Sequence, residues 1–226
     1  MPSAHCEPAA EGLKLFADDP LRFQPETHSS YSTYGWILVS AAIESVANKP
    51  FFTFMRDEIF QPLGRRDTTT DSLTDPVPNT VTFYHPRFGG DTEIGPELAP
   101  KIDYSCFAGA GAFLTTPSDL VRFGLAMSSD KLLKPETVIR HTKQPLLAGE
   151  ETDFALGWTI DDIQLANEPA LLASVSNRTL LGGSTSLLTF PEQGIVVAVM
   201  SNTASANLRA IAMTIAHGFA EQLGSR

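Results

Sequence analysis

The chain has 226 residues, of which 42% are hydrophobic and 19% charged, a composition that fits a globular protein with a substantial core and excludes collagen-like, coiled-coil and disordered chains. Its 16 basic and 26 acidic residues give a formal net charge of -10, which repels phosphate backbones and anionic lipid surfaces, so we expect no nucleic-acid partner. No apolar stretch reaches the roughly 20 residues of a membrane span, and the first residues lack the pattern of a signal peptide. The sequence therefore predicts a soluble, cytoplasmic protein without a membrane span.

The first half of the chain predicts helices and one long loop. We expect a short helix within residues 9–18, a longer helix with a wide apolar stripe over residues 33–48, and a third helix over residues 51–60, which a proline and a glycine end. Residues 65–105 are rich in threonine, aspartate, proline and glycine, which is typical of a long ordered loop over the core.

The second half predicts a sheet between helices. Thr116 and Pro117 form a strong helix start, with a hydroxyl cap and a proline in the first turn, and another helix is expected over residues 135–143. An amphipathic helix over residues 204–223 closes the chain. Four apolar or alternating runs predict consecutive antiparallel strands at residues 154–159, 170–175, 184–190 and 195–200.

This order of elements favours an α+β fold in two parts. Residues 1–150 would form a helical subdomain with the long loop, and residues 151–226 the antiparallel strands and the closing helix.

The cysteines and histidines give no sign of a cofactor. Cys6 and Cys106 are the only cysteines and lie far apart in sequence, so we expect two free thiols rather than a bridge. The five histidines lack the spacing of metal ligands, and we expect neither a metal nor another cofactor.

Several motifs occur in a recognisable order. These are Tyr-Ser-Thr-Tyr-Gly-Trp at 31–36, Gly-Ala-Gly-Ala-Phe-Leu-Thr-Thr-Pro at 109–117, Ala-Leu-Gly-Trp at 155–158 and an apolar hairpin at 187–202. Together they resemble the serine β-lactamase-like superfamily, which includes class C β-lactamases, family VIII esterases, penicillin-binding proteins and a mitochondrial β-lactamase-like branch. The resemblance implies a β-lactamase/transpeptidase-like fold and hydrolysis of small-molecule esters, amides or β-lactams through an acyl-enzyme.

The resemblance also assigns roles to residues. Tyr31 matches the tyrosine of the family's Tyr-x-Asn motif and is the candidate general base, and Thr33 stands at the asparagine position. The family's basic-Thr-Gly strand corresponds to residues 176–178, where neither the basic residue nor the glycine is kept. The candidate substrate-binding residues are Ser176, Asn177, Arg178, Gly182 and Gly183.

The nucleophile is harder to place. The family uses the serine of a Ser-x-x-Lys motif upstream of the tyrosine, and none of residues 1–30 reads so. The Ser-x-x-Lys at 128–131 lies at a predicted helix end, and His-Thr-Lys at 141–143 on a predicted helix, so we interpret both as chance matches. Ser184 remains a candidate nucleophile, with a sheet-edge turn as the alternative, because its surroundings lack the last glycine of a Gly-x-Ser-x-Gly elbow.

Three interpretations of function follow. A tyrosine of ordinary pKa, about 10, is a neutral phenol at pH 7, so without the motif lysine Tyr31 would be a hydrogen-bonding or packing group. The chain is then a serine hydrolase truncated before its N-terminal strands and nucleophile helix, a non-catalytic remnant or binding module, or a part that needs a second chain to supply the nucleophile. Missing strands would leave an open sheet edge, which predicts self-association.

Overall fold

The computed structural model describes residues 5–25, 27–28, 30–73, 76–86, 95–129, 131–134, 154–180, 182–204 and 206–224, with the backbone alone for residues 154, 155 and 176–180. The chain forms two compact units. The first unit contains Met1–Thr80 and Lys101–Thr115, and the second contains Val81–Pro100 and Thr116–Arg226. The units alternate along the chain. The division into residues 1–150 and 151–226 stays a prediction.

The first unit is mainly helical. Its elements are the 3-10 helix η1 (Ala9–Leu15), α1 (Thr33–Ala47), α2 (Phe51–Phe54), the π-helical turn η2 (Met55–Phe60), the 3-10 turn η3 (Ser105–Phe107) and α3 (Ala108–Gly111), with a short antiparallel ladder of β1 (Thr69–Thr70) and β4 (Phe113–Leu114). The three helical segments predicted in this half are confirmed, although the third changes from α to π geometry at Met55.

In α1, the longest helix of this unit, the first and last positions are occupied by residues that favour a helix start and a helix end. Ser32 is the N-cap of α1 and accepts a hydrogen bond from the Gly35 N–H at 3.4 Å. Asn48 ends the helix in the left-handed conformation, which asparagine tolerates better than most residues. A side chain on Gly109 would collide with the Trp36 carbonyl, so the glycine lets α3 lie close against α1.

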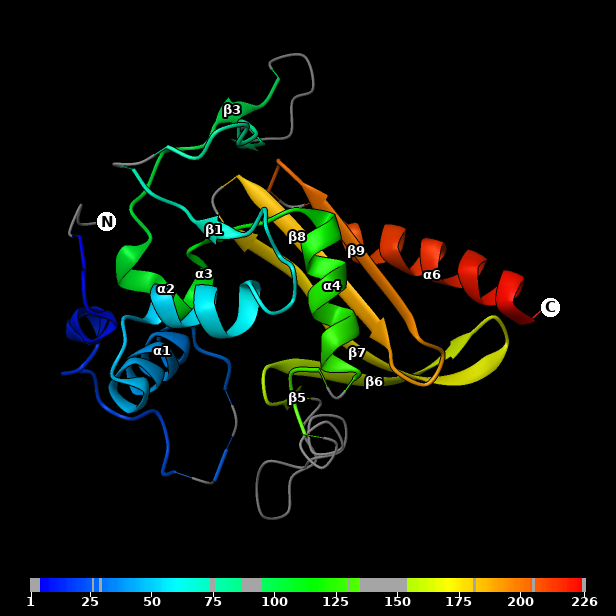
Figure 1. Ribbon diagram of the computed structural model, residues 1–226, viewed down its shortest axis with the longest axis horizontal. Coiled ribbons are helices and arrows are strands. Elements are labelled where there is room, and N and C mark those ends of the chain that lie inside the picture. Colours follow the sequence, from blue (N-terminus) through cyan, green and yellow to red (C-terminus); the bar gives the residue numbers. More distant parts are fainter. Residues whose placement is uncertain are drawn as a thin grey trace. The chain divides into compact units, whose positions relative to one another are not determined.

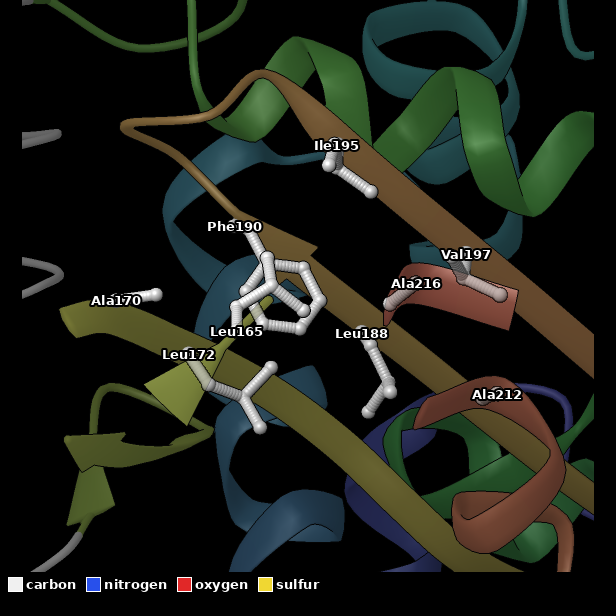
Figure 2. Close-up of a cluster of buried hydrophobic side chains, with 9 residues drawn as sticks. All are labelled: Leu165, Ala170, Leu172, Leu188, Phe190, Ile195, Val197, Ala212 and Ala216. Carbon is white, nitrogen blue, oxygen red and sulfur yellow. The ribbon is translucent and has the colours of Figure 1, made fainter. Parts of the chain in front are cut away.

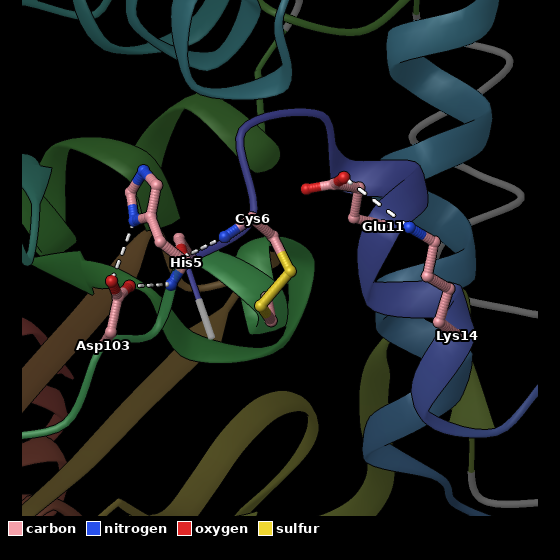
Figure 3. The surroundings of a disulfide bond; sticks show 7 residues. His5, Cys6, Glu11, Lys14 and Asp103 are labelled. Atoms are coloured by element: carbon pink, nitrogen blue, oxygen red, sulfur yellow. Dashed lines mark hydrogen bonds and ion pairs between the residues drawn. A yellow bond between two sulfur atoms is a disulfide. The ribbon is translucent and has the colours of Figure 1, made fainter. Parts of the chain in front are cut away.

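The expectation of two free thiols is wrong, because Cys6 and Cys106 form a disulfide across 100 residues of sequence (Figure 3). Separation in sequence misled the prediction, since the two segments lie side by side. The Cys6 N–H donates to Ser105 Oγ at 2.9 Å, and the His5 ring hydrogen-bonds to the Asp103 carboxylate at 2.8 Å. The two Cα atoms of the bridge are 4.9 Å apart.

The second unit is built on a five-stranded antiparallel sheet in the order β5-β6-β7-β8-β9. The strands are β5 (Phe154–Ala155), β6 (Trp158–Leu165), β7 (Glu168–Leu180), β8 (Gly183–Phe190) and β9 (Ile195–Ser201). The consecutive antiparallel strands are confirmed, with two corrections. The strand predicted at 170–175 extends over Glu168–Leu180. The single strand predicted at 154–159 is a hairpin, because Leu156 and Gly157 have positive φ angles of 46° and 97° and turn the chain between β5 and β6.

Two helices cover opposite faces of this sheet (Figure 1). Leu188 and Val197 belong to the cluster that packs under α6 (Leu208–Gly224), whereas Leu187 and Val196 belong to the cluster under α4 (Pro117–Met127). Neighbouring residues of a strand point to opposite faces, so the two clusters lie on the two sides of the sheet. Figure 2 shows the first of them, in which Phe190, Leu172 and Leu188 are fully buried.

The ends of these helices agree in part with the sequence analysis. Thr116 caps α4 and accepts a hydrogen bond from the Asp119 N–H at 3.3 Å, which confirms the predicted start. The helix α6 begins at Leu208, four residues later than predicted. The helix predicted over residues 135–143 lies outside the described residues. Among the helices that the structure describes, none is both long and apolar enough to cross a membrane.

Candidate functional site

Tyr31 and Thr33 lie at the beginning of α1, in the first unit. Tyr31 comes directly before the N-cap and is 49% exposed, and Thr33 is the first residue of the helix. Nearby on the same helix, Tyr34 stacks on Phe16 with ring centroids 4.9 Å apart. The capped helix start therefore holds the Tyr31 backbone in place while the phenol remains accessible to solvent.

The other candidate residues meet at one end of the hairpin of β7 and β8, in the second unit. Arg178 pairs with Thr185, and Leu180 pairs with Gly183. The register between the strands shifts between Val175 and Arg178, so the backbone of Ser176 and Asn177 forms a bulge. Bulges are frequent next to active sites because they redirect the strand locally.

Gly182 at the tip of this hairpin is required for close packing. Its φ is 86°, and a Cβ atom there would lie 2.5 Å from the Ala99 Cβ and 2.7 Å from the Phe83 Cβ. The neighbouring Gly183 lies against the Phe83 ring. The short ladder that carries Phe83 and Ala99, formed by β2 (Tyr84–His85) and β3 (Glu97–Leu98), therefore sits directly on the hairpin tip.

Asn202 has a role that the sequence analysis did not assign. Its Nδ2 donates to the Thr82 carbonyl at 2.8 Å, and its own carbonyl accepts a hydrogen bond from the Tyr84 N–H at 2.9 Å. The Ala204 N–H donates to the Tyr84 carbonyl at 3.0 Å. The residues after β9 thus hold the β2–β3 ladder against the hairpin through hydrogen bonds. The position of Asn202 just after an apolar strand is the one signal of this role in the sequence.

Ser184 is 2% exposed, and its Oγ donates to the Thr203 carbonyl at 3.0 Å. A serine nucleophile needs an accessible hydroxyl and a neighbouring base that takes its proton, and a backbone carbonyl is no such base. This burial and this partner are typical of a structural hydroxyl and do not favour the hypothesis that Ser184 is the nucleophile.

The internal Ser-x-x-Lys at 128–131 lies at the end of α4, as the sequence analysis expected. Ser128 is the C-cap of the helix, and Ser129 Oγ donates to the Ala126 carbonyl at 3.1 Å. Ser129 Oγ also accepts a hydrogen bond from the Lys131 N–H at 3.4 Å. These contacts make the segment a helix-ending turn. The His-Thr-Lys at 141–143 lies outside the described residues.

The described ranges contain no group of three or more histidine, cysteine, aspartate or glutamate side chains arranged to hold a metal ion.

Nearly the whole chain matches one known family. The model of the Beta-lactamase family matches residues 2–220. The chain belongs to the Beta-lactamase family. Among curated proteins, this family member is 28% identical to the mouse "Serine beta-lactamase-like protein LACTB, mitochondrial", over 94% of the chain and 44% of that protein. It is 23% identical to Penicillin-binding protein 4* of Bacillus subtilis, over 62% of the chain and 33% of that protein. The chain thus spans less than half the length of these relatives.

Solved structures confirm the fold of this Beta-lactamase-family chain. A penicillin-binding protein from Bacillus halodurans matches with a TM-score of 0.77 and 20% identity, over 96% of the chain and 65% of that protein. The octameric penicillin-binding protein homologue from Pyrococcus abyssi matches with a TM-score of 0.73 and 19% identity, over 96% and 48%. The D-amino acid amidase from Ochrobactrum anthropi SV3 matches with a TM-score of 0.72 and 18% identity, over 96% and 66%. The predicted β-lactamase/transpeptidase-like α+β fold is therefore correct.

Proposed function

We propose that this Beta-lactamase-family chain is part of a serine hydrolase that cleaves small-molecule ester, amide or β-lactam bonds through an acyl-enzyme. The observation that carries the proposal is the position of Tyr31, an exposed tyrosine at the capped start of α1 that matches the tyrosine of the family's Tyr-x-Asn motif, with Thr33 at the asparagine position. In this proposal the phenol transfers the proton of the attacking serine, and Thr33 orients the substrate beside it.

We infer that the nucleophile comes from polypeptide outside these 226 residues. Ser184 is buried and its hydroxyl donates a hydrogen bond to the Thr203 carbonyl, and the Ser-x-x-Lys at 128–131 ends a helix. A Ser-x-x-Lys segment would supply the attacking hydroxyl and also an ammonium group, which lowers the pKa of a neighbouring phenol. The segment would belong either to a longer form of the same chain or to a second chain.

A second candidate function, a binding module without catalysis, is favoured by the hairpin sequence. Residues 176–178 read Ser-Asn-Arg where the family has a basic residue, threonine and glycine, and Thr33 replaces asparagine. Loss of groups that stabilise the acyl transition state costs catalysis more than it costs binding. The two functions therefore differ in acylation, which can be measured directly.

The experiment uses the chain alone and a chimera. In the chimera, the part of the Bacillus halodurans penicillin-binding protein that this chain does not cover is joined to the chain, to supply the Ser-x-x-Lys segment that the family resemblance implies. Both proteins are treated with a fluorescent penicillin and a fluorophosphonate, and the labelled residue is located by mass spectrometry. We expect no adduct on the chain alone and an adduct on the supplied serine in the chimera.

The role of Tyr31 is tested in the same chimera. Tyr31→Phe should lower turnover of a nitrophenyl ester by about 100-fold, the scale of general acid–base catalysis. Tyr34→Phe is the matched control, because Tyr34 is a partly exposed tyrosine of the same helix that stacks on Phe16. An adduct on Ser184 in the chain alone would overturn the proposed nucleophile, and a folded chimera that binds penicillin without acylation would favour the binding module.

The compartment is a separate proposal. The sequence predicts the cytoplasm, whereas disulfides persist mainly in oxidising compartments, and Cys6 and Cys106 are bonded. We infer that the chain folds in an oxidising compartment, where this disulfide can form. When the protein is unfolded in an alkylating agent directly after cell lysis, mass spectrometry should find no alkylated cysteine, and two alkylated cysteines would restore the cytoplasmic prediction.

A further inference from the structure

The 3-10 helix η1 contacts α1 from its first residue onward. The Ala9 N–H donates a hydrogen bond to the Glu44 carboxylate, with distances of 3.3 and 3.2 Å to the two carboxylate oxygens. In the middle of η1, a Cβ atom on Gly12 would lie 2.7 Å from the Ile37 Cγ2 atom, so the glycine lets the two helices touch. The first half of η1 therefore lies directly against α1.

The contact continues to the end of η1. Phe16 is the C-cap of η1, and its ring stacks on the Tyr34 ring with centroids 4.9 Å apart and planes inclined by 10°. The partners on α1 move from position 44 through 37 to 34 along η1, so η1 runs antiparallel to α1 and ends at the first turn of that helix. The lengths agree, because η1 up to its C-cap rises about 14 Å and α1 between its outer partners rises about 15 Å.

The beginning of this segment is fixed by a covalent bond. Cys6, which precedes η1, is bonded to Cys106 in η3 (Figure 3). The Cys6 N–H also donates to Ser105 Oγ at 2.9 Å, and a Cβ atom on Gly12 would collide with the Cys106 carbonyl. Residues 6–16, which we call the η1 segment, are thus held at one end by the disulfide and at the other by the ring of Phe16.

The first turn of α1 benefits from a restraint beyond its own hydrogen bonds. The first four N–H groups of a helix have no partner within the helix, so this end frays most easily. The cap bond from the Gly35 N–H to Ser32 Oγ is long at 3.4 Å, and long hydrogen bonds are weak. Tyr34 lies between these two residues in the sequence, so its stack on Phe16 restrains the same turn from outside the helix.

We propose that Phe16 is a positioning residue for Tyr31, an inference that rests on the proposed function of Tyr31. Through Tyr34, the η1 segment fixes the first turn of α1 and so limits the positions of the phenol that directly precedes the N-cap. Proton transfer requires this phenol within hydrogen-bond reach of the attacking hydroxyl, and a small displacement of a reacting group lowers the rate. Phe16 thus affects the reaction without touching the reacting atoms.

The flat face of the Phe16 ring carries this effect. A stacked pair of aromatic rings strengthens a contact by a factor of about 2 to 10 beyond the apolar area that it buries. Phe16→Leu keeps an apolar side chain and removes the face that lies nearly parallel to Tyr34. Phe16→Tyr keeps that face. We therefore expect Phe16→Leu to loosen the first turn of α1 and Phe16→Tyr to preserve it.

Phe52 provides a matched control in the same unit. Its ring lies edge-on to the Phe113 ring, with centroids 5.7 Å apart. It belongs to α2, beyond the far end of α1, and the 15 residues of α1 span about 22 Å. Phe52→Leu should therefore lower the unfolding free energy through a lost aromatic contact without disturbing the turn that carries Tyr34.

The first measurement uses the chain alone and does not depend on catalysis. NMR of protein with ¹³C-labelled tyrosine rings follows Tyr31, whose signals are assigned by their loss in Tyr31→Phe. Phe16→Leu should move these signals toward those of an unfolded peptide and speed exchange of the Gly35 amide by about 2- to 10-fold. Phe16→Tyr and Phe52→Leu should leave both unchanged. Tyr31 signals that stay the same in Phe16→Leu, or that move equally in Phe52→Leu, would overturn the proposal.

The second measurement uses the chimera with the Bacillus halodurans segment. Turnover of a nitrophenyl ester is expressed per active site, and the sites are counted with fluorescent penicillin. Phe16→Leu should lower kcat by about 2- to 10-fold and leave KM unchanged, whereas Phe16→Tyr and Phe52→Leu should retain kcat. A loss of stability alone would lower the number of active sites and not the turnover of each site.

The outcomes separate this inference from the proposed function. If Phe16→Leu and the unchanged chimera had equal kcat, Phe16 would have no positioning role, and the proposed function would stand. If the chimera formed no adduct in any variant, the acyl-enzyme proposal would fail. The Tyr31 signals of the chain alone would then still decide whether Phe16 positions the phenol.

Discussion

His5 and Asp103 form an ion pair of 2.8 Å beside the disulfide, on the surface of the first unit (Figure 3). The pKa of His5 lies above its ordinary value of 6.5 because Asp103 accepts a hydrogen bond from the ring and carries a negative charge. Desolvation alone would raise the pKa of Asp103, but hydrogen bonds from Ser105 and His5 outweigh it and hold that pKa below 3.8.

The pair should be strongest in a window of pH. A raised histidine pKa means that the contribution of His5 to stability is complete below pH 6.5 and disappears as the pH rises through the folded-state pKa. A lowered carboxylate pKa means that the contribution of Asp103 is present above pH 3.8 and disappears as the pH falls through its folded-state value. The ion pair between His5 and Asp103 therefore contributes most to stability between about pH 4 and pH 6.5.

An NMR titration of the His5 ring checks this. Its midpoint should lie above 6.5 in the unchanged chain and return toward 6.5 in Asp103→Asn. Asp18→Asn, which removes an exposed carboxylate of the same unit, should leave the midpoint where it was. A midpoint that stays the same in Asp103→Asn would contradict the conclusion that Asp103 raises the pKa of His5.

Two glycines that both have a positive φ but lie in different surroundings allow a second test. Gly182 has a φ of 86° and is crowded by Ala99 and Phe83, whereas Gly194 has a φ of 64° and no atom within 4 Å of the Cβ position. Gly194→Ala should cost about 1 kcal/mol of unfolding free energy for the left-handed backbone alone. Gly182→Ala should cost about 2–4 kcal/mol, because a clash is added. Denaturant unfolding measures both, and equal costs would mean that the ladder over the hairpin is free to move aside.

Residues whose role depends on distant partners could not be predicted. Nothing near Cys6 in the sequence points to Cys106, and nothing near Ser184 points to the Thr203 carbonyl. Tyr31 could be placed at a helix start because its neighbour Ser32 is a local capping signal.

Helix starts with such signals were predicted to within a residue. The helix α4 is an example, since Thr116 and Pro117 stand at its cap and its first position. The strand β6 was underestimated because Asp161 and Asp162 interrupt its apolar pattern. The Asp161 carboxylate bonds to Arg209 of α6, 48 residues later, which removes the cost of an acidic residue at that point.

The cap of α4 gives a prediction at the scale of the element. Thr116→Ala removes the oxygen that accepts the Asp119 N–H bond and should cost about 1 kcal/mol of unfolding free energy. Ser118→Ala, in the first turn of the same helix, should be neutral or slightly stabilising, because alanine has the higher helix propensity. Thermal unfolding followed by circular dichroism compares the two variants. If Thr116→Ala left the unfolding free energy unchanged, the hydroxyl would not be a cap in solution.

At the scale of the whole molecule, the order of motifs was enough to predict the fold. The interleaving of the two units was not predictable, because residues 81–100 have no strong apolar pattern. Their attachment to the second unit depends on backbone bonds to Asn202 and Ala204, which leave no trace in composition.

The disulfide should be a main source of stability for the first unit. It closes a loop of 100 residues, for which the chain-entropy model gives about 4–5 kcal/mol. Thermal unfolding with a reducing agent should therefore show a lower midpoint than without it. The double variant Cys6→Ser with Cys106→Ser should unfold at the lower midpoint in both buffers. A reductant that shifts the double variant as well would point to some other reducible group.

The bond between the Asn202 side chain and the Thr82 carbonyl joins residues 120 apart. A ribosome that adds 5–20 residues per second needs roughly ten seconds to make that length of chain. Residues 81–100 leave the exit tunnel well before the strand that will hold them exists, while residues 101–115 can already complete the first unit. In the nascent chain this stretch therefore stays unattached while the sheet is synthesised. During that interval it is accessible to a chaperone or a protease.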